Sequence, residues 1–228
     1  MATDCMEITQ VCSLGTLCHS AMILKRNALK KCSYPFDWTH SNCDMILHCI
    51  EDEFKTFLDK SQYISQTQTS CMHKIYMPQV SMFQHHNPVT NGRNYAYFCR
   101  CVGRFRQLLK HREHKLFTMM YINKPPERVA EYKRIVSEFD IKLSNHTSNY
   151  TLLCIVHSHG SGRKRASHTL TRVGNVDFLE FRTHHVSTGT SFVRLNDNTY
   201  LNNLLTHMYT FNLQNPPTHE PTHPPPPP

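Results

Sequence analysis

Hydrophobic residues fall into two patterns along this chain: short continuous runs, and longer stretches in which they recur every three or four positions. The continuous runs predict buried strands at 7–13, 115–122, 150–156 and 176–183, with a further short strand at 79–83. A run of this length suits a strand whose two faces are both covered. The chain therefore contains the elements of a buried sheet.

Apolar positions at helical spacing, with charged residues between them, predict the amphipathic helices that would cover such a sheet. One helix begins near Cys18, and a later one begins at Pro125, where a first-turn proline loses no hydrogen bond. The remaining helices are expected at 42–58, 95–109 and 199–209. The polar stretch 59–71 reads as a loop, and the Gly/Ser/basic stretch 157–168 reads as another.

Strands that alternate with helices predict an α/β fold, with a central, mostly parallel sheet flanked by helices. We assign this single domain to residues 1–214. The sequence "NPPTHEPTHPPPPP" at 215–228 has no means of packing and is expected to form a disordered, Pro-rich tail.

The composition indicates the cellular compartment in which this protein is expected to work. The chain has 228 residues, ten cysteines and a formal net charge of +8. No run approaches the roughly 18 apolar residues of a membrane span, and the start "MATDCMEITQ" lacks the features of a signal peptide. We therefore expect an intracellular, cytoplasmic protein with reduced cysteines.

Cys18 occupies the position where a thiol is most easily activated. It follows a predicted strand and the turn at Gly15, and it begins a predicted helix. Unpaired N–H groups at a helix start favour a thiolate and are expected to lower its pKa. The amides of residues 16 to 18, including Thr16, could stabilise an oxyanion. The alternative is a buried cysteine that serves only as a small apolar side chain.

An activated cysteine needs an imidazole nearby. His85 follows the predicted strand 79–83, and strand ends converge on one edge of an α/β sheet. His86 and His19 are competitors for this role. Asp37, which lies between two aromatic residues in "SYPFDW", could orient the imidazole. In the alternative interpretation, Asp37 is a turn residue that packs against Trp38.

Metal and phosphate sites are weaker candidates. Cys99 and Cys101 are too close in sequence for a zinc knuckle, and the histidines at 157, 159, 184 and 185 show no four-ligand spacing, so we expect no metal and no cofactor. The loop 160–165 could bind a phosphate, but a solvated basic hairpin is the simpler interpretation.

Five ordered motifs, "SLGTLCHSAMIL", "SYPFDWTHSN", "IEDEFKTFL", "FQHHNP" and "YFCRCVGRFRQLL" followed by "LFTMMYI", resemble a family of "putative papain-like cysteine peptidases", a domain of unknown function found in bacteria and large DNA viruses. The resemblance implies Cys18 as nucleophile and His85 as base. Asp37 and Trp38 match a Pro-Phe-Asp-Trp motif. A papain-like protein would have an α+β fold with a separate antiparallel sheet, which is the alternative architecture.

The resemblance also implies a substrate-binding role for a basic helix. Arg100 and Arg104 fall on that helix, whereas Cys99 stands where the family has the first of two arginines. His86 stands where members of the family often have an aspartate. The candidate substrate-binding residues are therefore Gly15, Thr16, Trp38, His86, Arg100 and Arg104.

Two functions follow from these features. The first is a thiol-dependent hydrolase or acyltransferase that acts in the cytoplasm on an unknown acyl, peptide or glycan substrate. Because the resembling family occurs in large DNA viruses, this expectation includes the cytoplasm of a virus-infected host. The second is a non-enzymatic basic protein that binds nucleic acid or another polyanion. A phosphate-bearing acyl donor would combine the two. The residues available to such a binder are Arg93, Arg100, Arg104, Arg163, Lys164 and Arg165.

Overall fold

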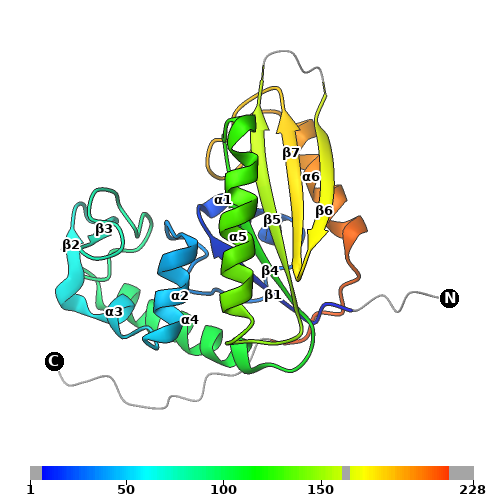
Figure 1. Ribbon diagram of the computed structural model, residues 1–228. Coiled ribbons are helices and arrows are strands. Elements are labelled where there is room, and N and C mark those ends of the chain that lie inside the picture. The colour runs from blue at the N-terminus through cyan, green and yellow to red at the C-terminus, as the bar shows by residue number, and fades with distance from the viewer. Residues whose placement is uncertain (1–6, 161–164, 216–228) are drawn as a thin grey trace.

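A five-stranded sheet forms the centre of the computed structural model, which describes residues 7–160 and 165–215. The strand order is β1-β4-β5-β7-β6, and the first four strands run parallel while β6 runs antiparallel to β7 (Figure 1). The strands are β1 (Gln10–Gly15), β4 (Lys115–Tyr121), β5 (Tyr150–His159), β6 (Ser167–Val173) and β7 (Val176–Thr183). The predicted α/β fold with a mostly parallel sheet is confirmed.

Helices cover both faces of this sheet, as the alternating side chains of its strands require. In β4, Leu116 and Met120 belong to one buried cluster, whereas Phe117 and Met119 belong to the other. The first cluster packs against α1 and α6, and the second against α2, α4 and α5. The helices are α1 (Cys18–Arg26), α2 (Cys43–Glu51), α3 (Lys55–Leu58), α4 (Gly92–Lys110), α5 (Val129–Leu143) and α6 (Leu195–Met208), with 3-10 turns η1 (Lys60–Gln62) and η2 (Pro126–Arg128).

A small lobe beside the sheet contains the hairpin of β2 (Tyr63–Ser65) and β3 (Cys71–His73) (Figure 1). Two predictions for this region are wrong. The expected strand at 79–83 is absent from the described chain; only Phe83 forms single bridges, to Thr39 and Cys71. The stretch 59–71, expected to be a loop, contains β2 and the start of β3 instead. Whether these segments form strands depends on pairing between distant parts of the chain. Their local hydrophobic patterns are too short to predict that pairing.

Two further boundaries differ from the predictions. The expected helix 42–58 is broken into α2 and α3, because Glu53 and Phe54 both adopt left-handed backbone angles, with φ of 56° and 60°. Both ends of the expected loop 157–168 are strand, because β5 continues to His159 and β6 begins at Ser167. Arg163 and Lys164, which were candidates for phosphate or polyanion binding, lie outside the described residues. Most of the predicted tail lies outside the described residues, so the domain boundary stays a prediction. No helix in the described ranges is long and apolar enough to cross a membrane.

Candidate active site

The turn between β1 and α1 places Cys18 at the first position of its helix. Gly15 and Thr16 both have left-handed backbone angles, with φ of 81° and 61°, and Leu17 returns to an extended conformation before α1 begins. A Cβ atom on Gly15 would lie 2.5 Å from the Ser41 Oγ and 2.6 Å from the Phe36 carbonyl oxygen. Only glycine fits this turn, because both the backbone angle and the space exclude a side chain.

Ser41 holds the same turn from the outside. Its hydroxyl donates to the Leu14 carbonyl oxygen at 2.8 Å and accepts the Thr16 N–H at 3.0 Å, and the side chain is buried. The segment 36–41 therefore fixes the backbone immediately before the cysteine. Ser41 lies in the motif "THSN", but nothing in the sequence of this motif predicts its hydrogen bonds to Leu14 and Thr16.

We expect Ser41→Ala to lower the free energy of unfolding by about 1–3 kcal/mol, since it leaves a buried N–H and a buried carbonyl without their partner. Urea unfolding followed by tryptophan fluorescence measures the change. Ser144→Ala is the matched control, because its hydroxyl is exposed and bonds only the Ile141 carbonyl. It should change stability by less than about 0.5 kcal/mol. Equal effects of the two substitutions would contradict the role of Ser41.

His85 reaches the site on a loop that is anchored on both sides. Before it, Phe83 exchanges two backbone hydrogen bonds with Cys71, at 2.9 and 3.0 Å, and its ring is fully buried among Phe57, Tyr63 and Phe98.

After it, the buried Asn87 side chain binds three groups of the β2–β3 hairpin: the Ser65 hydroxyl at 2.8 Å, the Thr67 carbonyl at 2.7 Å and the Ser70 carbonyl at 3.2 Å. Its Oδ1 also accepts the Val89 N–H. His85 was predicted to lie at the edge of the main sheet. It lies instead on this anchored loop.

Cys18 and His85 meet although 67 residues separate them. The Cys18 Sγ lies 3.7 Å from the His85 Nε2, within hydrogen-bond range for sulfur. The thiol is 6% exposed and the imidazole is exposed. A reagent therefore meets the histidine first and the sulfur behind it.

The ionisation of Cys18 differs from the prediction. Burial raises the pKa of the thiol, and the negative charge of Asp37 raises it further, while the backbone N–H of Cys18 itself lowers it. The expected lowering by the helix start is present but is smaller than the cost of burial. Cys18 is therefore a protonated thiol at neutral pH, and a base must take its proton when it reacts.

Asp37 does not bind His85. Its Oδ2 accepts the Lys30 Nζ and the Tyr34 N–H, the latter at 2.9 Å, and the carboxylate is 1% exposed. Its Oδ1 is buried and has no partner within the described residues. Burial raises the pKa of Asp37, against the opposing effect of Lys30. The structure supports the turn-forming interpretation of Asp37 and leaves His85 without an orienting carboxylate in the described chain.

Other predicted residues lie near the site, yet most of their polar groups are engaged. The Thr16 N–H and hydroxyl bind Ser41 and the Met120 carbonyl, so its amide is not free for an oxyanion. The His86 ring packs on Tyr97, with centroids 4.6 Å apart, and burial lowers its pKa.

The two arginines of the basic helix differ from each other. Arg104 donates to the Ser33 carbonyl at 2.9 Å and to the Cys101 sulfur, whereas Arg100 is exposed on α4. Trp38 is half-buried with the Lys30 ammonium 5.8 Å from its ring. Arg104 therefore supports the loop that precedes Asp37.

A second anchor next to Cys18 was not predicted. The buried His19 pairs its Nδ1 with the Ser187 hydroxyl at 2.8 Å, and Asn123 exchanges two hydrogen bonds with the Ser187 backbone. His157 accepts the Asn123 N–H on its Nδ1, so its Nε2 carries the proton toward Thr183. Burial lowers the pKa of His19 to about 3 and that of His157 to about 4. Both imidazoles are neutral and structural.

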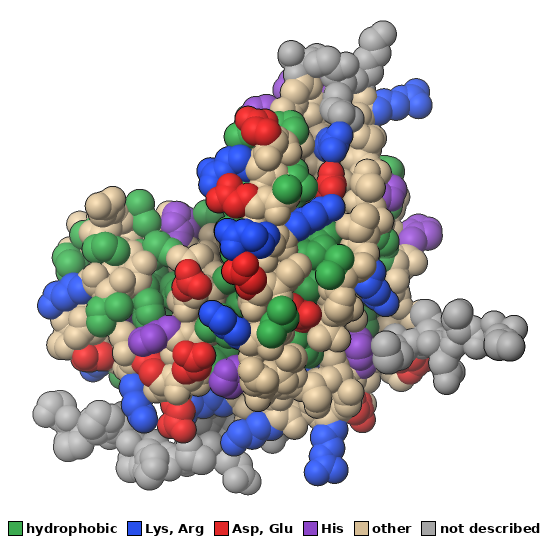
Figure 2. Space-filling view, in the orientation of Figure 1, with side chains coloured by type: hydrophobic (Ala, Val, Ile, Leu, Met, Phe, Trp, Pro, Cys, Tyr) green, Lys and Arg blue, Asp and Glu red, His purple; other side chains and the backbone are tan. Residues whose placement is uncertain are grey.

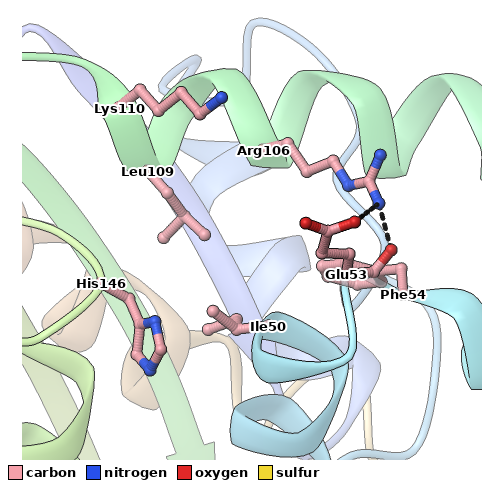
Figure 3. Close-up of a pocket in the computed structure, with 7 residues that line it drawn as sticks. All are labelled: Ile50, Glu53, Phe54, Arg106, Leu109, Lys110 and His146. Atoms are coloured by element: carbon pink, nitrogen blue, oxygen red, sulfur yellow. Dashed lines mark hydrogen bonds and ion pairs between the residues drawn. The ribbon is translucent and has the colours of Figure 1, made fainter.

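A cavity of about 250 Å³ lies at the end of α4 and includes neither Cys18 nor His85 (Figure 3). It has an apolar floor and is lined by Ile50, Glu53, Phe54, Arg106, Leu109, Lys110 and His146. Its Lys and Arg side chains, Arg106 and Lys110, lie near the C-terminal end of α4, where helix carbonyls favour positive charge. Across the ranges described, no three His, Cys, Asp or Glu side chains gather as a metal site.

The fold and the Cys–His pair define an α/β protein with a cysteine at a helix start and a histidine beside it. A family model described as "Putative papain-like cysteine peptidase" matches residues 9–160, and the chain belongs to this family. No curated protein and no solved structure matches the chain.

Proposed function

We propose that this protein is a thiol-dependent hydrolase or acyltransferase in which Cys18 is the nucleophile and His85 is the general base. The observation that carries this proposal is the 3.7 Å contact between the Cys18 Sγ and the His85 Nε2 at the start of α1. The description of the family as cysteine peptidases agrees with a cysteine nucleophile. Asp37 is proposed as a residue that positions the loop before Ser41, because its carboxylate binds Lys30 and Tyr34.

The reaction would begin from a protonated Cys18 thiol, because burial raises the pKa of Cys18. As the sulfur attacks an acyl carbon, the His85 Nε2 takes the thiol proton. The bond from that carbon to the leaving group then breaks, the imidazolium protonates the leaving group, and a thioester remains on Cys18. Water or a second nucleophile, deprotonated by His85, releases the acyl group.

The oxyanion site would lie within α1 itself. The Thr16 amide binds Ser41, and no side chain caps α1, so we propose the N–H groups of its first turn, beginning with that of Cys18, as the donors. The proposed donors therefore begin at Cys18, two residues later than the range 16 to 18 expected from the sequence.

Alkylation by iodoacetamide tests the pair in the native protein. We expect Cys18 to be labelled fastest, with a rate that climbs into the alkaline range, because its pKa lies above that of an ordinary thiol, about 8.5. At pH 7, His85→Ala should slow this labelling by about tenfold or more, since general-base assistance is lost. Mass spectrometry of tryptic peptides measures the rate at each cysteine.

Two controls make this experiment decisive. Cys18→Ala should remove the fast-labelling site and leave the other cysteines unchanged, and His86→Ala should leave the Cys18 rate within about twofold because His86 packs on Tyr97. Persistence of the fast phase in Cys18→Ala would contradict the nucleophile. A rate that is constant between pH 5 and 8 would contradict the raised pKa of the Cys18 thiol.

Binding of nucleic acid or another polyanion is the second candidate. The net charge of +8 and the exposed Arg93 and Arg100 on α4 support it, whereas Arg104 is engaged by Ser33. Binding of this kind weakens steeply as salt rises and is the same in Cys18→Ala. A phosphate-bearing acyl donor is compatible with both candidates.

A further inference from the structure

Two sequence motifs meet at the cavity of about 250 Å³ at the end of α4, away from the Cys18–His85 pair (Figures 2 and 3). The motif "IEDEFKTFL" supplies three of its lining residues and "YFCRCVGRFRQLL" supplies two. The cavity includes neither Cys18 nor His85, so whatever it binds is independent of the proposed reaction.

The wall formed by Glu53 and Phe54 is rigid. Both residues have left-handed backbone angles, which are costly in residues other than glycine and persist only where the surrounding packing enforces them. The Phe54 side chain is 1% exposed. Its ring packs against those of Phe36, Phe57 and Phe105, with centroids 5.8, 5.7 and 5.7 Å away. The cavity is therefore formed before a ligand arrives, which avoids the cost of ordering a flexible site.

The positive charges around the cavity are not equivalent. The Arg106 guanidinium donates to the Glu53 carbonyl oxygen, and its Nη2 lies 3.9 Å from the Glu53 Oε2. The Lys55 ammonium lies 3.8 Å from the same carboxylate oxygen. Lys110, one turn after Arg106 on α4, has no carboxylate or carbonyl partner for its ammonium within the described chain. One unmatched positive charge therefore remains at the edge of the cavity.

Capping of α4 does not account for Lys110. Cations at the C-terminus of a helix ordinarily interact with its last carbonyl groups. Here the Lys115 Nζ donates to the His111 carbonyl oxygen at 2.6 Å. The Thr147 hydroxyl donates to the Leu109 carbonyl oxygen at 2.7 Å. Because these carbonyl groups already have partners, the Lys110 ammonium is available to a ligand.

An apolar floor lies between the polar groups of the rim. Figure 3 shows the Leu109 and Ile50 side chains in the middle of the cavity, with Lys110 and Arg106 on one side and His146 on the other. The His146 ring carries an N–H in either charge state, so the far side also has a donor. A ligand with an aliphatic body and one negative end matches this arrangement, because the body covers the floor while the charge meets Lys110.

The volume and the charge together specify the ligand. A volume of about 250 Å³ equals roughly eight water molecules at about 30 Å³ each, which is room for about eight to ten non-hydrogen atoms. A phosphate monoester carries close to two negative charges at neutral pH and would need a second unmatched cation. A carboxylate needs only one.

We propose that this cavity binds a medium-chain aliphatic carboxylate, with the carboxylate on Lys110 and the chain over Leu109 and Ile50. The inference goes beyond the proposed function, because it gives the protein a ligand site separate from the Cys18–His85 pair.

Isothermal titration calorimetry with sodium octanoate and the full-length protein at pH 7 tests this site. We expect a Kd on the order of 1 mM, because about ten non-hydrogen atoms provide only weak binding even in a well-formed cavity. Butanoate lacks most of the chain that covers the floor, and octylamine reverses the charge. Both should bind at least about tenfold more weakly than octanoate.

Substitutions at Lys110 locate the binding. Lys110→Met keeps an aliphatic side chain and removes the charge, so it should weaken octanoate binding about tenfold, whereas Lys110→Arg should keep the Kd within about threefold. Lys142→Met is the matched control, since Lys142 is also an exposed lysine in the last turn of a helix and does not line this cavity. It should leave the Kd within about twofold. Both lysines are exposed, so these variants should unfold at the same urea concentration as the parent protein.

Three results would overturn the inference. The first is no binding of octanoate at about 10 mM, and the second is equal binding to Lys110→Met and the parent protein. The third is octyl phosphate that binds more than about tenfold tighter than octanoate, since the cavity would then select two negative charges. Alkylation of Cys18 is measured separately, so each of these results leaves the proposed function standing.

Discussion

Asp37→Asn is expected to lower the free energy of unfolding by about 3–5 kcal/mol, the cost of breaking a buried ion pair. Asp37 is 1% exposed and the Lys30 side chain is 11% exposed, so the substitution leaves an ammonium group with no carboxylate in a nearly dry site. Urea unfolding measures the loss. The alkylation rate of Cys18 in the folded variant should not fall, because Asp37 does not contact His85; it should rise modestly, since the charge of Asp37 raises the Cys18 pKa.

A double variant separates charge from packing at this position. Lys30→Met with Asp37→Leu removes both charges and should recover part of the stability lost by Asp37→Asn, because no unpaired charge remains. If Asp37→Asn instead kept its stability and lost the fast labelling of Cys18, Asp37 would act in the chemistry, as the triad expected from the sequence would require.

Gly15→Ala is expected to destabilise the protein by about 3 kcal/mol or more. The new Cβ would be 2.5 Å from the Ser41 Oγ and 2.6 Å from the Phe36 carbonyl oxygen, and the backbone angle of 81° disfavours alanine in any case. Any relaxation must move the turn that carries Cys18, so the fast labelling should fall as well. Thermal and urea unfolding, together with the labelling rate, measure the two effects.

Gly189→Ala is the matched control for this substitution. Gly189 has a φ of 97°, and a Cβ there would meet nothing within 4 Å. Alanine at this position should therefore lower the free energy of unfolding only by the cost of its backbone conformation, about 1 kcal/mol. Equal losses at the two glycines would show that the overlap with Ser41 and Phe36 is relieved without cost, which would contradict the rigid turn described here.

Much of the fold could be predicted because its signals are local. The apolar run at 150–156 and the spacing of Tyr95, Phe98 and Phe105 are properties of neighbouring residues, and they gave the core of β5 and of α4. The helix 42–58 was predicted too long, since its apolar pattern continues through Glu53 and Phe54, where the backbone turns left-handed.

The small lobe that contains β2, β3 and His85 could not be predicted in the same way. Its strands have three residues each, and Phe83 is held by backbone bonds to Cys71 and by three buried rings. Such contacts join segments that no local periodicity relates. Asn87 is a similar case, because its role depends on three hydrogen-bond partners located 17 to 22 residues earlier.

The sequence by itself determined the α/β architecture and the place of Cys18 directly after a strand and a glycine turn, because both depend on short-range patterning and on the backbone freedom of Gly15. Only the tertiary structure decided what surrounds the thiol. Packing places the His85 Nε2 3.7 Å from the Cys18 Sγ and buries Cys18, which raises the pKa of its thiol. The Asp37 carboxylate binds Lys30 and not His85. These are long-range effects, since desolvation and side-chain pairing depend on which distant segments exclude water from the site.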